Sequence, residues 1–288
     1  MKHRITRRQS LTLIGATLAA VTLPTASLLA NKDGMRQKAF ADTDKTLPVI
    51  GMGTWRTFNV GSDPQLLDAR TEVVKAFFEH GGGLIDSSPM YGSAPDVMGY
   101  ALEQLGTPES LFAAEKVWSP AGGSAREQVA ELKDRWKVEH FDLVQVHNLT
   151  DWREHLSALQ EMKAEGIIRH VGITTSHGRR HREAENRLLP LAEEQGIGVI
   201  ANRPYDGGSL IKHLKRRNAP LPEWAQAECG CITWADFLLK FIVSHPAITC
   251  AIPATTQVEH LRENMRAGHS PMPSTEARQR MAAYIESL

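Results

Sequence analysis

Short apolar runs alternate with longer amphipathic stretches along the chain after its first thirty residues. Runs such as LFAAEKV and FDLVQVH are mostly apolar on both faces, as strands buried within a parallel sheet are. The stretches between them place apolar residues at helical spacing, and glycines follow several of them as helix stops. Repeated strand-then-helix units require parallel strands joined by right-handed crossovers. The sequence therefore predicts an α/β fold.

The pattern resolves into seven strands and eight helices. Ser124 and Asp151 are the expected N-caps of two helices. No Rossmann-type glycine fingerprint accompanies the units, so a parallel (β/α) TIM-type barrel is favoured over an open dinucleotide-binding sheet. Residues 31–288 are assigned to this one domain. The predicted strands cover residues 47–54, 84–88, 111–117, 141–147, 168–174, 197–201 and 248–252. The predicted helices cover residues 64–80, 94–105, 124–136, 151–165, 183–195, 231–245, 258–266 and 274–288.

Charge and cysteine content exclude several classes of function. The chain has 33 Lys and Arg against 33 Asp and Glu, so no nucleic-acid partner is expected. Its three cysteines, Cys229, Cys231 and Cys250, have no further Cys or His cluster that would complete a zinc site, and no metal is expected. We interpret them as structural, with a disulfide to Cys250 as the open alternative in an oxidising compartment.

The first thirty residues have the layout of a secretory signal. A basic start precedes an apolar stretch over residues 11–23, which is short for a membrane span. The adjacent Arg7 and Arg8 resemble the twin-arginine signals of bacteria. Residues 1–30 are therefore predicted to be a signal peptide that is cleaved near Ala30 and directs the chain through the twin-arginine export machinery to the periplasm. An uncleaved membrane anchor is the alternative.

Polar residues stand at the carboxyl ends of three predicted strands. Asp86 ends one strand, with Tyr91 just beyond it, and Lys116 and His147 end the next two. In an α/β barrel these ends carry the active site. Carbonyl reduction needs a proton donor for the carbonyl oxygen, and a tyrosine can serve if a nearby lysine lowers its pKa. Asp86 would hold the lysine charged, and His147 would orient the carbonyl oxygen.

The runs that hold these residues, LIDSSPMYGS, AAEKV and DLVQVHN, resemble the aldo-keto reductase family. LPVIGMGTW, IRHVGITTSH and IPATTQVEHLRENM resemble it too, so that the likeness spans roughly residues 47–265. The resemblance implies NAD(P)H-dependent reduction of small aldehydes or ketones. It also implies that Asp86, Tyr91, Lys116 and His147 form a catalytic tetrad in which Tyr91 is the general acid.

The resemblance further implies a set of cofactor-binding residues. Where many relatives carry Lys and Arg for the 2′-phosphate, this chain has Ala254 and His260, and Arg262 is the possible substitute. NADPH is the expected cofactor on family grounds, and NADH is the alternative. The implied cofactor residues are Gly53, Thr54, Trp55, Thr174, Thr175, Arg203, Thr255, Glu263 and Asn264.

One strand-and-helix unit is expected to be missing relative to the family. The segment between residues 174 and 197 has room for a single helix, and seven strands are found where a barrel of this kind has eight. A barrel short of one strand must close across the gap or stay open. This favours, as an alternative function, a non-catalytic cofactor-sensing or partner-binding barrel with a degraded cofactor site. A metal-dependent hydrolase is disfavoured because His147 has no second ligand at neighbouring strand ends.

Overall fold

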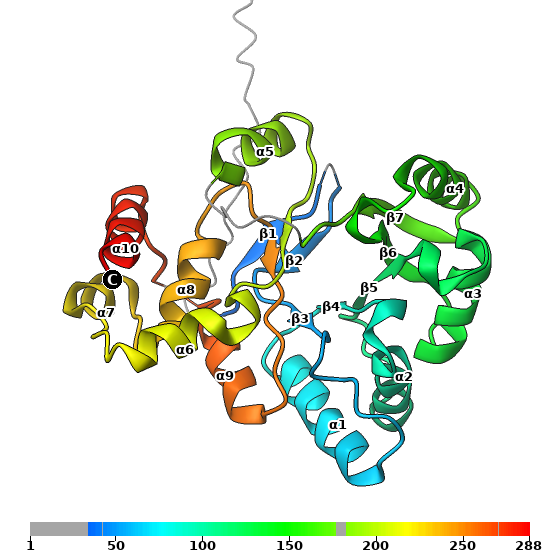
Figure 1. Cartoon of the computed structure of the whole chain (residues 1–288), viewed down its shortest axis with the longest axis horizontal. Helices are drawn as coiled ribbons and strands as arrows, with labels where there is room; N and C mark the ends of the chain where they lie inside the picture. Colours follow the sequence, from blue (N-terminus) through cyan, green and yellow to red (C-terminus); the bar gives the residue numbers. More distant parts are fainter. Residues whose placement is uncertain (1–33, 42, 177–182, 270) are drawn as a thin grey trace, which may run out of the picture.

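A computed structural model describes residues 34–41, 43–176, 183–269 and 271–288 (Figure 1). The predicted signal peptide, residues 1–30, lies outside these ranges, so that its role stays a prediction. Within the described ranges, none of the helices is both long enough and apolar enough to cross a membrane.

A five-stranded parallel sheet forms the first half of the fold, with its strands in sequence order. Four helices alternate with the strands and lie on the right-hand side of the view in Figure 1. This confirms the predicted parallel α/β architecture. The strands are β3 (Met52–Gly53), β4 (Leu84–Asp86), β5 (Phe112–Val117), β6 (Phe141–Val146) and β7 (Ile168–Ile173). The helices are α1 (Pro64–Glu79), α2 (Ala94–Leu105), α3 (Ala125–Trp136) and α4 (Trp152–Ala164).

Side-chain capping is present at some helix starts and absent at others. Ser124 and Glu127 form the reciprocal capping box at the start of α3, which confirms Ser124 as an N-cap. Asp151 occupies the N-cap position of α4, but its side chain makes no capping hydrogen bond and its backbone is left-handed, with φ 48°. The predicted N-cap position of Asp151 is therefore confirmed, although its side chain does not cap the helix. Its backbone carbonyl accepts instead from the N–H groups of Glu154 and His155.

The described residues of the second half add two strands and six α-helices. β8 (Ile200–Ala201) pairs in parallel with β9 (Cys250–Ala251), and Ala251 bridges in parallel to Ile50, just before β3. The parallel series therefore runs β8, β9, β3, β4, β5, β6, β7. Figure 1 shows α6–α10 gathered on the left of this series. The helices are α5 (Glu183–Glu194), α6 (Ser209–Arg216), α7 (Glu223–Cys229), α8 (Trp234–Val243), α9 (Val258–Arg266) and α10 (Thr275–Ser287).

The first predicted strand, residues 47–54, is divided between two sheets. Its start belongs to β2 (Thr46–Pro48), which pairs antiparallel with β1 (Gln37–Ala39), and its end is β3. Pro48 has no N–H to donate, which suits it to the end of the hairpin ladder. Lys38 of β1 donates to the backbone carbonyls of Val243, His245 and Ile248 at 2.8, 2.6 and 2.7 Å, so that the hairpin is tied to the end of α8.

The described residues do not form a closed barrel. No hydrogen-bonded ladder among them joins β7 to β8, and the part of the connection that is described, residues 174–176 and 183–199, contains the one helix α5. The strands β4, β5, β6, β7, β8 and β9 follow one another along the chain in the predicted order. The deletion of one unit relative to the family stays a prediction.

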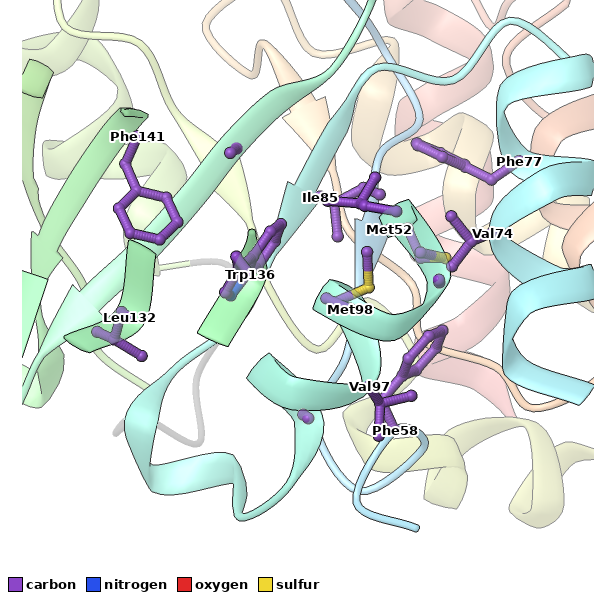
Figure 2. Close-up of a cluster of buried hydrophobic side chains, with 14 of the residues drawn as sticks. Met52, Phe58, Val74, Phe77, Ile85, Val97, Met98, Leu132, Trp136 and Phe141 are labelled. Atoms are coloured by element: carbon purple, nitrogen blue, oxygen red, sulfur yellow. The ribbon is translucent and has the colours of Figure 1, made fainter. Parts of the chain in front are cut away.

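The main core lies between the five-stranded sheet and its helices. Met52 and Ile85 from the sheet meet Val74 and Phe77 of α1 and Met98 of α2 (Figure 2). Burial of each such side chain contributes about 1.5–3 kcal/mol. This core holds the face of the sheet that packs against the helices. The carboxyl ends of the strands therefore lie together at one edge of the sheet.

Gly99 allows α2 and α3 to approach closely. A Cβ at this position would lie 1.9 Å from the carbonyl oxygen of Arg135, which no side chain could tolerate. The two helices therefore pack backbone to backbone at this point.

A carboxyl group is buried behind the sheet at Glu115 of β5. Its oxygens accept from the indole N–H of Trp136 at 3.1 Å and the backbone N–H of Lys116 at 2.7 Å, and the side chain is fully buried. Burial raises the pKa of Glu115 to about 8, although the neighbouring Lys116 charge acts to lower it. The folded protein therefore keeps this proton at pH values where the unfolded chain has lost it.

The free energy of unfolding is expected to fall as pH rises from about 5 to 8. The raised pKa of Glu115 stabilises the fold below the ordinary value of 4.5, and this stabilisation is lost as pH rises through about 8. The slope from one such group reaches about 1.4 kcal/mol per pH unit. Urea unfolding at pH 5, 6, 7 and 8 measures it. Glu115→Gln is expected to flatten the slope, and an unchanged slope in that variant would contradict the assignment.

Candidate active site

Four polar side chains line one cavity at the carboxyl end of the sheet, with a volume of about 260 Å³. Asp86 is the last residue of β4, Lys116 lies near the end of β5, and His147 directly follows β6. Tyr91 ends the short 3-10 turn η1 (Pro89–Tyr91) that follows β4. The structure therefore brings together all four residues that the strand-end pattern predicted.

Lys116 and Asp86 form an ion pair that is almost fully buried. The Lys116 Nζ lies 2.6 Å from Asp86 Oδ2 and also donates to the backbone carbonyl of Ser87. Asp86 Oδ1 accepts from Gln145 Nε2 at 3.0 Å, so that each carboxylate oxygen has a partner. Burial acts to lower the pKa of Lys116, but the surrounding negative charges, Asp86 first, outweigh it and raise the pKa. Lys116 is therefore held as an ammonium ion.

The Tyr91 ring lies beside this ammonium ion, with Lys116 Nζ 5.3 Å from its centroid. Burial raises the pKa of the Tyr91 phenol, and the charge of Lys116 lowers it by less. The prediction that Lys116 leaves Tyr91 with a lowered pKa is therefore wrong, because the pKa of Tyr91 is raised overall. The charge of Lys116 by itself acts in the predicted direction. The pKa is raised overall because the cavity that brings the two groups together also removes water from the phenol.

His147 is held by two aromatic rings and a hydroxyl group. Its ring meets Tyr91 edge-on, with centroids 5.9 Å apart, and lies tilted against Trp118 at 6.3 Å. Its Nδ1 lies 2.7 Å from the hydroxyl oxygen of Ser88. Tyr91 and His147 therefore occupy adjacent positions on one wall of the cavity.

The loop after His147 has a strained backbone. Three residues, Asn148, Leu149 and Asp151, have positive φ values of 53°, 58° and 48°. Residues other than glycine seldom adopt such backbone angles. Asn148 also lines the cavity, and its Oδ1 accepts from the backbone N–H of Ser176 at 3.1 Å. Strain of this kind persists where surrounding contacts impose it, commonly beside functional sites.

Part of the predicted cofactor set lines the same cavity. Thr54 is fully buried, and its hydroxyl contacts that of Ser87 at 2.8 Å. The Trp55 ring stacks with Arg203, whose guanidinium lies 5.4 Å from the ring centroid and pairs with Asp206 at 3.1 Å. The predicted residues that line the cavity are Gly53, Thr54, Trp55, Thr174 and Arg203.

Four other predicted cofactor residues do not line the cavity. Thr175 contributes its backbone carbonyl to Asn202 at 3.2 Å. Thr255 accepts from the N–H of Gln257 just before α9, and Asn264 is buried and accepts from the hydroxyl of Tyr205 at 2.6 Å. Glu263 lies half-buried on α9. These residues contribute to the structure of the β9–α9 region, and their cofactor role stays a prediction.

Comparison with known proteins gives the same family. The aldo/keto reductase family model matches residues 49–184. Methylglyoxal reductase YeaE of Escherichia coli is 28% identical over 250 residues, which cover 77% of this chain and 85% of that protein. The NADH-specific methylglyoxal reductase of Escherichia coli is 25% identical over 81% of this chain and 93% of its own. The family model and both relatives therefore make the chain similar to the aldo/keto reductases.

A solved structure of the same family agrees with the fold. The aldo-keto reductase of Klebsiella pneumoniae in complex with NADPH has a TM-score of 0.73 and 23% identity over 86% of this chain and 95% of that chain. The parallel strands of this chain therefore follow the architecture of that fold.

Two residues that line or contact the candidate site are not among those predicted from the sequence. Gln145 lies on β6, two positions before His147. Because side chains alternate between the two faces of a strand, this spacing predicts that both lie on the same face. Ser88 follows Asp86 by two positions in the same way. The hydroxyl contact of Ser88 with His147 joins residues 59 apart in sequence, and nothing in the sequence predicts such a distance.

Proposed function

We propose that this chain is an aldo/keto reductase that reduces small aldehydes or ketones with a nicotinamide cofactor, with NADPH as the preferred cofactor and NADH as the alternative. The single observation that carries the proposal is the convergence of the Lys116–Asp86 pair, Tyr91 and His147 on one cavity. Similarity to the aldo/keto reductase family and the names of the curated relatives support it.

In this proposal the cofactor, when bound, supplies a hydride to the carbonyl carbon. The Tyr91 hydroxyl gives its proton to the carbonyl oxygen, and the phenolate that forms is stabilised by the Lys116 ammonium ion. Asp86 keeps Lys116 charged and in place, as their 2.6 Å contact supports. His147 donates a hydrogen bond to the carbonyl oxygen, which lowers the cost of the developing charge.

The polar and aromatic groups that line the cavity suit a nicotinamide cofactor. Gly53 lines the cavity and packs closely against Ile252, because a Cβ there would lie 2.8 Å from the carbonyl oxygen of Ile252. Asn148 and Asn202 offer amide groups to a carboxamide, and Arg203 offers a cation to a phosphate. Trp55 offers an aromatic face. We assign the nicotinamide end to these residues, and Thr255, Glu263 and Asn264 remain proposed for the adenosine end.

The substrate we propose is a small α-oxoaldehyde such as methylglyoxal. Two curated relatives are named as methylglyoxal reductases. Met90, Ile200 and Ile252 add apolar lining beside the polar groups, which suits a short carbon chain.

NADPH binding by the full-length chain tests the cofactor proposal. A fluorescence titration is expected to give saturable binding of NADPH, with NADH weaker by no more than about tenfold, or about 1.4 kcal/mol. The small difference follows from Arg262, which is half exposed and already paired with Glu259 at 2.8 Å. Turnover of methylglyoxal is then followed by loss of cofactor absorbance. A folded chain that binds neither cofactor would contradict the proposal.

A non-catalytic cofactor-sensing or partner-binding barrel is the second candidate. The observation that favours it is the unpaired β7 edge in the described part of the chain, with Ile173 57% exposed. Leu188 and Leu191 of α5 are also exposed. We further propose that one unit is deleted between residues 174 and 197, which would account for that edge. Cofactor binding without turnover of any small aldehyde would favour this second candidate.

The export of the protein is also a proposal. The leader of residues 1–30, with Arg7 and Arg8, supports delivery to the periplasm by the twin-arginine machinery. Cell fractionation of the full-length chain tests this, with an Arg7→Lys, Arg8→Lys double variant as the control. Equal distribution of both forms would contradict it.

A further inference from the structure

Ser88 contacts both halves of the candidate site through one buried hydroxyl group. The residue is fully buried and stands at the N-cap of η1, the turn that ends in Tyr91. Its oxygen accepts from the backbone N–H of Met90 at 3.2 Å and lies 2.7 Å from Nδ1 of His147. These two groups are the polar partners of the hydroxyl among the described residues.

The proton of this hydroxyl determines the state of His147. The Met90 N–H can only donate to Ser88, so that the hydroxyl proton has His147 Nδ1 as its available acceptor. If Nδ1 carried a proton instead, the Ser88 hydroxyl would receive two donors and its own proton would be buried without a partner. A buried unsatisfied donor of that kind is costly. A neutral imidazole therefore keeps Nδ1 bare and carries its proton on Nε2.

We propose that Ser88 is a positioning residue that holds His147 as the neutral Nε2–H tautomer and, through the same oxygen, fixes the turn that carries Tyr91. The inference rests on the proposed reductase function for its catalytic consequence, but the tautomer itself is a property of the fold. The ring contacts with Tyr91 and Trp118 restrict where the imidazole lies. Ser88 sets which nitrogen holds the proton that a carbonyl oxygen would accept from His147.

Ser88→Ala tests this inference with two measurements. Two-bond 1H–15N spectra of histidine-labelled protein report the tautomer, and the His147 signals among the 12 histidines are identified by their loss in His147→Gln. The wild type is expected to show Nε2–H alone, and Ser88→Ala a mixture with Nδ1–H. The kcat/KM for methylglyoxal is expected to fall about tenfold, the size of effect one lost hydrogen bond produces, while NADPH affinity stays the same.

Ser87→Ala is the matched control. Ser87 is equally buried and adjacent in sequence, but its hydroxyl contacts Thr54 and not His147, so that the His147 signals should stay as in the wild type. Ser88→Thr keeps a hydroxyl and is expected to restore the Nε2–H signal. A single Nε2–H tautomer in Ser88→Ala, or an Nδ1–H tautomer in the wild type, would overturn the inference. A wild type without turnover would instead overturn the proposed function, and the spectra would still decide the role of Ser88.

Discussion

Replacing Tyr91 with phenylalanine is expected to lower kcat for methylglyoxal reduction by about a hundredfold to ten-thousandfold, the range for loss of a general acid. The substitution removes the hydroxyl group and keeps the ring that packs edge-on against His147 at 5.9 Å. Stability and NADPH affinity should therefore change little. Steady-state kinetics measure the loss, and thermal unfolding with a cofactor titration of the same variant shows that the site is otherwise intact.

The same comparison separates the two candidate functions. An enzyme that uses Tyr91 loses turnover and keeps its cofactor affinity, whereas a cofactor-sensing barrel has no turnover to lose. A Tyr91→Phe variant within about tenfold of the wild type would contradict the assignment of Tyr91 as the acid. In that case His147, on the same wall of the cavity, would be the next group to test.

The order of the strands could be predicted because buried parallel strands and amphipathic helices differ in period, which the sequence shows directly. The four residues at the strand ends followed from that order, since parallel strands present their carboxyl ends at one edge. The division of residues 47–54 between two sheets could not be predicted. Its apolar residues suit both pairings, and the choice is made by contacts with β1 and β4.

Properties that depend on distances between side chains in the folded protein could not be predicted from the sequence. The net pKa shift of Tyr91 depends on how much water the fold removes as well as on the nearness of Lys116. The places of Thr255 and Asn264 outside the cavity depend on how α9 packs, because the residue types suit a ligand and a helix start equally well. Ser88 became visible as a candidate only when its hydroxyl was placed against His147.

Replacing Lys116 with methionine is expected to have the largest effect on stability, a loss of about 3–5 kcal/mol, because it leaves Asp86 buried without its cation. Turnover should be lost as well. Lys116 lowers the pKa of Tyr91, so that its removal raises this pKa further and makes the phenolate harder to form. Urea unfolding and steady-state kinetics of the variant measure the two effects.

Lys240→Met is the matched control for this substitution. Lys240 is equally buried, but its Nζ donates to the backbone carbonyls of His269 and Pro271. Its replacement therefore leaves no carboxylate of the candidate site without its cation. We expect a smaller loss of stability and retained turnover. The double variant Asp86→Asn, Lys116→Met should then lose less stability than the two single variants together, since neither partner is left with an unmatched charge. Strictly additive losses would mean that burial of the pair, and not its mutual attraction, accounts for the effect.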